Sequence, residues 1–189
     1  ITCFMIIPTG VASLKLRRYS VETACPNGGC HDAVTYIGTA PIKWTDRGFY
    51  DTINTSRSDP RWPIRCTCGY VFKETDQWQT VQDEIYEAPD GQKYTTNFRD
   101  APPGAMWDAL HLKDIWPGPD GMSLCVVLPS GEHWCIDSPS RTGGFWDRKD
   151  KGIPPRISPT PSIQSSRYHG FLVDGTFTDD MEGRTYEME

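Results

Sequence analysis

Apolar and polar residues alternate along several stretches of the chain. Over residues 11–19, alanine and leucine alternate with serine, lysine and arginine, which is the period of two that is typical of a half-buried strand. Residues 33–44 are rich in valine, threonine, tyrosine and isoleucine and predict a second strand. The polar, turn-rich residues 45–63 are expected to form a loop.

Turn sequences predict where further strands pair. Pro89-Asp90-Gly91 is expected to join residues 84–88 to 92–98, and Pro129-Ser130-Gly131 to join residues 123–128 to 132–137. A three-residue loop in the second hairpin places Cys125 opposite Cys135, whereas a two-residue loop shifts the register and separates them. Residues 167–173 predict a last strand, followed by the two-residue turn Asp174-Gly175.

Two short segments have helical rather than alternating spacing. Residues 79–86 predict a short helix, and residues 105–112, after Pro102-Pro103-Gly104, predict an amphipathic helix laid on the sheet. The fold class is therefore expected to be mainly β (α+β), with antiparallel sheets and hairpins and one or two short helices. We expect a single domain over residues 1–178 and an acidic tail over residues 179–189.

Two pairs of cysteines flank the second predicted strand and the loop that follows it. The first pair is in Cys25-Pro-Asn-Gly-Gly-Cys30 and the second in Cys66-Thr-Cys68. Two turns that each present two thiols can bring four sulfurs to one tetrahedral ion, as in structural zinc sites. We therefore expect zinc bound by Cys25, Cys30, Cys66 and Cys68 in a lobe of about residues 20–75. One residue between Cys66 and Cys68 is an unusual ligand spacing, so His31 is an alternative ligand.

Charge and composition narrow the choice of partners and compartment. With 19 Lys and Arg against 25 Asp and Glu, the net charge is −6, whereas nucleic-acid binders usually carry a basic excess. No apolar run approaches the roughly 20 residues that cross a bilayer, so we expect a soluble protein. Seven cysteines is an odd number, which fits a reducing compartment better than a disulfide framework.

The second hairpin also contains the best candidate catalytic residues. Every second residue of its second strand carries a candidate group, and these residues, His133, Cys135 and Asp137, share one strand face. His169 follows in the last predicted strand. A thiol needs a nearby base to act as a nucleophile at neutral pH. The alternative is that Cys135 packs in the β core as a small apolar residue.

Several motifs carry a resemblance to a known group of proteins. The segments concerned are Cys25-Pro-Asn-Gly-Gly-Cys-His31, Cys66-Thr-Cys-Gly69, Pro102-Pro-Gly-Ala-Met-Trp107, Trp134-Cys-Ile-Asp-Ser138 and Tyr168-His-Gly-Phe171. Over most of the chain they resemble uncharacterised zinc-binding proteins of actinobacterial bacteriophages and prophages. That resemblance implies a location in the host cytoplasm or in the virion.

The end of the chain carries a second resemblance. Pro161-Ser-Ile163, His169-Gly-Phe171 and Asp174-Gly175 are similar to the ending of a cysteine-rich family found beside bacterial ubiquitin-like conjugation genes. The compact cysteine knuckle of that family is replaced here by widely separated pairs.

Two classes of function remain open from the sequence. The first is an interaction or particle-associated protein with protein partners, in which residues 138–166 form a long loop and Trp146 and Arg156 make contact. The second is a cysteine- or metal-dependent hydrolase or peptidase that uses Cys135, His133, Asp137 and His169.

Overall fold

The computed structural model describes residues 1–189 except 46–47, 50–52, 54, 141–142, 149–151 and 187–189. The chain divides into two compact units. One, here called the metal unit, comprises Pro8–Tyr86 and Thr95–Asn97; the other, the C-terminal unit, comprises Ile1–Ile7, Glu87–Tyr94 and Phe98–Glu189. The metal unit contains the whole of the lobe expected at about residues 20–75.

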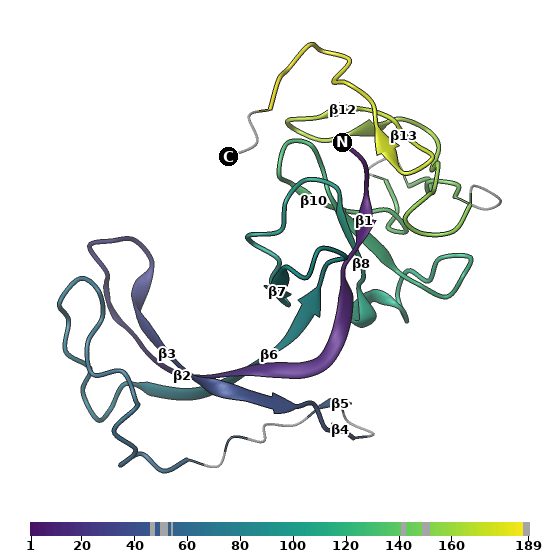
Figure 1. Cartoon of the computed structure of the whole chain (residues 1–189). Helices are drawn as coiled ribbons and strands as arrows, with labels where there is room; N and C mark the ends of the chain where they lie inside the picture. Colours follow the sequence, from purple (N-terminus) through teal and green to yellow (C-terminus); the bar gives the residue numbers. More distant parts are fainter. Residues whose placement is uncertain (46–47, 50–52, 54, 141–142, 149–151, 187–189) are drawn as a thin grey trace. The chain divides into compact units, whose positions relative to one another are not determined.

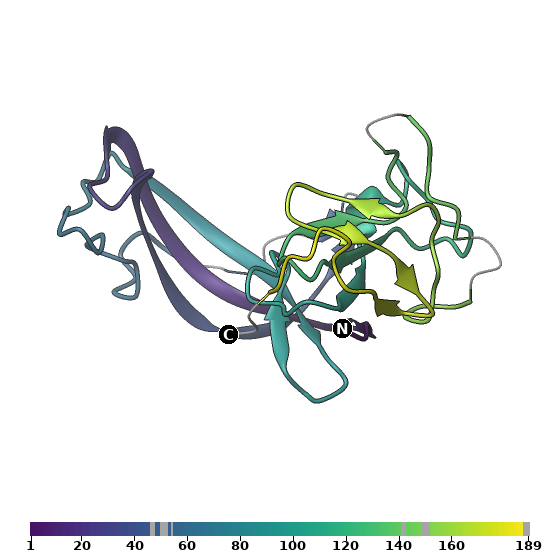
Figure 2. The same ribbon diagram turned by 90° about the horizontal axis from the view of Figure 1, so that it is seen from above.

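The metal unit is built mainly on the three long strands of one sheet. The order of this sheet is β3-β2-β6-β7, and the long strands β3, β2 and β6 lie side by side in Figures 1 and 2. Lys93 and Tyr94 of β7 are counted with the C-terminal unit. The strand bounds are β2 Ile7–Ala24, β3 Cys30–Pro41, β6 Gln77–Glu87 and β7 Lys93–Thr95; the short strands β4 Trp44–Thr45 and β5 Gly48–Phe49 pair with each other. The first two predicted strands are therefore confirmed, and β2 extends beyond the predicted residues at both ends.

The pairing of β2 with β3 leads the chain to the two cysteine-containing turns. The strands are antiparallel from Val11↔Pro41 to Ala24↔Cys30, with an irregularity between Ser20 and Ala24. Along β2, Leu16, Arg18 and Ser20 are buried at alternate positions, so one face of the strand points inward. The β2–β3 connection and the segment before β6 then supply the thiols.

The C-terminal unit has a four-stranded sheet of order β1-β8-β9-β10 and two small strand pairs. The pairing of β1 with β8 is parallel, and β8–β9 and β9–β10 are antiparallel. The strand bounds are β1 Phe4–Met5, β8 Ala105–Asp108, β9 Leu124–Val127, β10 His133–Cys135, β11 Ile163–Gln164, β12 His169–Gly170, β13 Leu172–Val173 and β14 Thr176–Phe177.

A continuous hydrophobic core holds the C-terminal unit together. It joins alternate residues of the central strands to the last third of the chain; its buried members are Cys3, Met106, Leu124, Val126, Leu128, Ile136, Ile157, Ile163, Tyr168, Leu172 and Phe177. Tyr186 packs against this core, and Asp180 is buried. The acidic segment from residue 179 therefore packs onto the unit as far as residue 186.

The two predicted helices are wrong. Residues 79–86 lie in β6, and residues 105–108 form β8; among the described residues, only the 3₁₀ turn η1 (Leu110–Leu112) is helical. In β6 the β-branched side chains suit a strand that pairs with β2. In β8, Met106 and Trp107 are both buried, which is the pattern of a central strand covered on both faces and not of an amphipathic helix. No helix in the described part of the chain is long and apolar enough to cross a membrane.

The predicted turns and the mainly β class are confirmed. Cys125 pairs with Cys135 across the three-residue loop, and Gly131 has a φ of 80°. Asp174 and Gly175 have φ angles of 45° and 74° between the paired residues Val173 and Thr176, as expected for a type I′ turn.

Candidate metal centre

Two turns with the same backbone hydrogen bonds present the cysteines of the metal unit. In the first, the Gly28 amide donates to the carbonyl of Cys25, and the Cys25 amide donates to the carbonyl of Gly29, at 2.9 and 3.0 Å. In the second, the Gly69 amide donates to Cys66 and the Cys66 amide to Tyr70, at 2.9 and 2.8 Å. The backbone conformation requires glycine at these positions, because the φ of Gly28 is 95° and that of Gly69 is 96°.

The turns bring three thiols and one imidazole to a common centre. The ligand atoms of Cys25, His31, Cys66 and Cys68 all lie within 4.8 Å of one another. Cys25 Sγ is 4.0 Å from Cys66 Sγ, and His31 Nδ1 is 3.2 Å from Cys68 Sγ. Two sulfurs bound to one tetrahedral ion at about 2.3 Å lie about 3.8 Å apart. The four side chains are therefore spaced to hold one metal ion.

Backbone amides donate to two thiols of the cluster, with opposite net results for the pKa of each. The amide of Cys68 is the largest of several donors that lower the pKa of Cys66 to about 6, although burial opposes them. The amide of Asn27 acts in the same way on Cys25, but burial and the thiols of Cys68 and Cys66 outweigh it and raise the pKa of Cys25. Crowding of thiols in this way favours the protonated form at one site until a cation neutralises the cluster.

Neighbouring side chains fix the ring of His31. Its Nε2 lies 3.0 Å from the hydroxyl of Thr23, which leaves Nδ1 facing the thiols. Tyr70 stacks on the ring, with 4.1 Å between centroids and 11° between planes, and its hydroxyl donates to Asp76 at 3.2 Å. A partner on the second ring nitrogen is the usual support of a metal-binding histidine.

Cys30, which the sequence placed in the ligand set, is not part of this cluster. Cys30 and His31 are successive residues of β3, so their side chains point to opposite faces of the strand. Ala33, two residues after His31, packs against the cluster of Cys25, Cys66 and Phe72. The face that meets the thiols is thus that of His31.

The proposed catalytic residues of the C-terminal unit do not assemble into one site. His133 is exposed and packs edge-on against Trp107, with 5.2 Å between ring centroids. His169 Nδ1 lies 3.5 Å from Glu182, and among the described contacts no hydrogen bond or ion pair joins it to His133, Cys135 or Asp137. Cys135 is half-buried, with Ser123 Oγ 4.0 Å from its sulfur.

Asp137 belongs instead to a buried charge network. Arg148 donates to both of its oxygens, from Nε at 2.7 Å and from Nη2 at 3.0 Å, and the Leu124 amide donates to Oδ2 at 2.8 Å. Arg148 also donates to both oxygens of Asp120, at 2.7 and 2.9 Å. Burial lowers the pKa of the guanidinium, but its hydrogen bonds to Asp120 and Asp137 outweigh burial and raise the pKa. Sequence reasoning missed Arg148 and Asp120, because no local pattern links residues so far apart in the chain.

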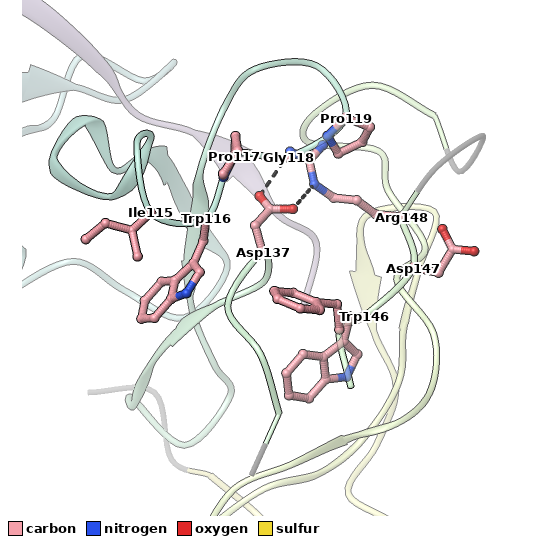
Figure 3. Close-up of a pocket in the computed structure, with 10 residues that line it drawn as sticks. Ile115, Trp116, Pro117, Gly118, Pro119, Asp137, Trp146, Asp147 and Arg148 are labelled. Atoms are coloured by element: carbon pink, nitrogen blue, oxygen red, sulfur yellow. Dashed lines mark hydrogen bonds and ion pairs between the residues drawn. The ribbon is translucent and has the colours of Figure 1, made fainter. Parts of the chain in front are cut away.

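A pocket of about 470 Å³ lies over this network (Figure 3). Asp137 and Arg148 meet at one side of it, and the indoles of Trp116 and Trp146 form part of its wall. Its lining residues are Ile115, Trp116, Pro117, Gly118, Pro119, Asp137, Phe145, Trp146, Asp147 and Arg148. The pocket thus combines apolar rings with a guanidinium, that of Arg148, whose charge is already paired with carboxylates of the same unit.

The two loop residues expected to make contacts differ in their surroundings. Trp146 packs edge-on against Trp134, with 5.0 Å between ring centroids, and its Nε1 donates to the Ser162 carbonyl at 3.4 Å. Arg156 is exposed and pairs with Asp174 at 2.7 Å. Only Trp146 lines the pocket.

Comparison of the chain with protein-family models, with curated proteins and with solved structures found no match.

Proposed function

We propose that this chain is a zinc-stabilised interaction protein, encoded by a phage or prophage and working in the host cytoplasm or on the particle. The observation that carries the proposal is the closed ligand set of Cys25, His31, Cys66 and Cys68. Four protein ligands complete a tetrahedral zinc ion, whereas catalytic zinc keeps one position for water or substrate. Thiolate and imidazole ligands favour zinc over the harder cations, which prefer oxygen.

Metal analysis tests the zinc assignment. Protein purified without added metal is expected to contain about one zinc per chain, and Cys66→Ser is expected to lose it. Cys30→Ser is the matched control, because Cys30 lies beside His31 but outside the cluster. A metal content that falls with Cys30→Ser and not with His31→Ala would contradict this ligand set.

The pocket beside Arg148 supports a protein partner. Aromatic and proline side chains give contact area at low entropic cost, and Trp and Tyr dominate the energy of many interfaces. The positive charge of Arg148 is already paired with Asp137 and Asp120 within the unit, so it is not free to bind the phosphates of a nucleic acid. We infer that the pocket receives an apolar side chain of a protein partner.

Binding is tested with phage-producing cells. Particles purified from a host that carries the gene are searched for the chain by mass spectrometry, and partners recovered with it are reconstituted from purified components. Trp146→Ala is expected to weaken a direct complex by about tenfold or more, while Arg156→Ala, on the exposed pair with Asp174, should not. Turnover of an ester or peptide substrate that disappears with Cys135→Ser or His169→Ala would favour the hydrolase instead.

A further inference from the structure

Two cysteines outside the metal centre face each other in the hairpin of β9 and β10. Cys125 pairs directly with Cys135, and both thiols are free. Leu124 and Val126, which flank Cys125 in β9, belong to the hydrophobic core, so the two cysteines lie on the opposite face of the sheet. The strand β10 is at the end of the sheet order, which leaves one side of Cys135 without a neighbouring strand in the sheet.

The hydrogen bonds of the hairpin define the type of this pair. The Ile136 amide donates to Leu124, and the Leu128 amide donates to Glu132, both at 2.8 Å. Hydrogen-bonded and non-hydrogen-bonded pairs alternate along an antiparallel ladder, so Cys125↔Cys135 is a non-hydrogen-bonded pair. Cα atoms in such pairs are about 4.5 Å apart, within the range of about 4.4–6.8 Å that a disulfide spans.

The surroundings give the two thiols different roles. A hydrogen bond from Cys125, with a further one from Ser123, lowers the pKa of Cys135 to about 7 although burial opposes them. The pKa of Cys125 is raised, most of all by its hydrogen bond to Cys135, and then by burial and by the carboxylates of Asp137 and Asp108. At neutral pH, Cys135 is therefore the thiol that ionises more readily, and Cys125 keeps its proton.

We propose that Cys125 and Cys135 form a redox-active dithiol that exchanges with small-molecule disulfides such as glutathione disulfide. Cys135 Sγ attacks one sulfur of the disulfide, forms a mixed disulfide and releases one glutathione thiolate. Cys125 then gives its proton to that thiolate or to water and attacks Cys135 Sγ, which releases the second glutathione. Two protein thiols are oxidised to one disulfide, and one glutathione disulfide is reduced to two thiols. The bridge joins two strands that are already paired, so it needs no change of fold.

The sequence allows a direct test on the full-length, metal-loaded chain. Residues 114–141, released by trypsin, contain Cys125 and Cys135 and no other cysteine, whereas the metal ligands fall in residues 19–43 and 66–73. The chain is exposed to glutathione disulfide, alkylated and digested. We expect the 114–141 peptide to lose two hydrogen atoms and to escape alkylation, while Cys3, whose pKa burial raises to about 12, is alkylated once the chain is denatured. Alkylation of both Cys125 and Cys135 after this treatment would overturn the proposal.

Single substitutions separate the order of the two steps from a merely structural role. Cys125→Ser is expected to trap glutathione on Cys135, because the second attack is lost. Cys135→Ser should carry no adduct on Cys125, and Cys3→Ser should form the bridge as the unaltered chain does. Absence of the adduct in Cys125→Ser, or an adduct on Cys125 in Cys135→Ser, would refute the assignment.

Discussion

The turns at the ligand cluster and the C-terminal unit are held in place by different interactions. Beside the ligand cluster, the buried apolar group is Cys25, Cys66 and Phe72, and two of these three belong to the candidate ligand set. The C-terminal unit has a core that connects β8 and β9 to the last third of the chain. Loops without a sufficient core of their own are commonly fixed by a metal. Order near the turns should therefore depend on the ion, and order in the C-terminal unit on apolar burial.

Removal of the metal should give the largest effect and should separate the two units. Structural zinc contributes on the order of 10 kcal/mol in small domains, so a strong chelator is expected to unfold the turns that contain Cys25 and Cys66. Hydrogen exchange followed by mass spectrometry should show lost protection across about residues 20–75 and retained protection in β8 and β9. Equal loss of protection in both units would show that the C-terminal unit depends on the metal as much as the turns do.

The buried charge network is the corresponding test of the C-terminal unit. Arg148→Met leaves Asp137 buried without its partner, which typically costs about 3–5 kcal/mol. Chemical denaturation should show this loss, while the metal content stays unchanged. Arg156→Met is the control, because its pair with Asp174 is exposed at both side chains, and exposed pairs contribute little.

A second substitution distinguishes loss of charge balance from loss of packing. Combining Arg148→Met with Asp137→Asn removes the uncompensated charge, while the amide oxygen of Asn can still accept from the Leu124 amide. Partial recovery of stability is expected in the double variant. If the double variant is less stable than Arg148→Met alone, packing by Arg148 and not pairing is the larger contribution.

Local patterns in the sequence predicted the local structure well. The alternation over residues 11–19, the loop Pro129-Ser130-Gly131 and the turn Asp174-Gly175 each depend on neighbouring residues, and each is observed. Strand parity also contained the signal for His31: apolar Ala33 shares its face, and Cys30 does not. The sequence prediction paired the cysteines without considering which face of the strand each side chain occupies, and it therefore included Cys30.

Long-range contacts account for what the sequence did not predict. Residues 79–86 lie in a strand because β2 offers a pairing edge, and tertiary pairing overrides a weak helical period. The same holds for Arg148, which joins Asp120 and Asp137 from two other segments. Neither the pairing of β6 with β2 nor the two carboxylate partners of Arg148 can be identified from spacing along the chain.

Acid should expose a smaller difference, through Glu132 of the C-terminal unit. Its carboxylate accepts hydrogen bonds from Ser165 at 2.5 Å, Ser166 at 2.6 Å and Ser130 at 2.9 Å. Burial raises the pKa of Glu132, but these hydrogen bonds outweigh it and lower the pKa from its ordinary 4.5 to about 2. A carboxyl whose pKa is depressed in the folded state stabilises fully above its ordinary pKa, and this stabilisation is lost as the pH falls toward about 2.

Glu132→Gln is therefore expected to destabilise the C-terminal unit by about 1 kcal/mol at pH 7, and by progressively less between pH 4.5 and about 2. Hydrogen exchange in peptides that cover β10 to β12 reports this unit by itself, which matters because acid also protonates the thiols and releases the metal from the other unit at higher pH. Glu87→Gln, at the exposed end of β6, is the control. A difference between Glu132→Gln and the unaltered chain that is constant from pH 7 to pH 3 would mean that the serine hydroxyls bind Gln as well as the carboxylate, and that the charge of Glu132 is not what they stabilise.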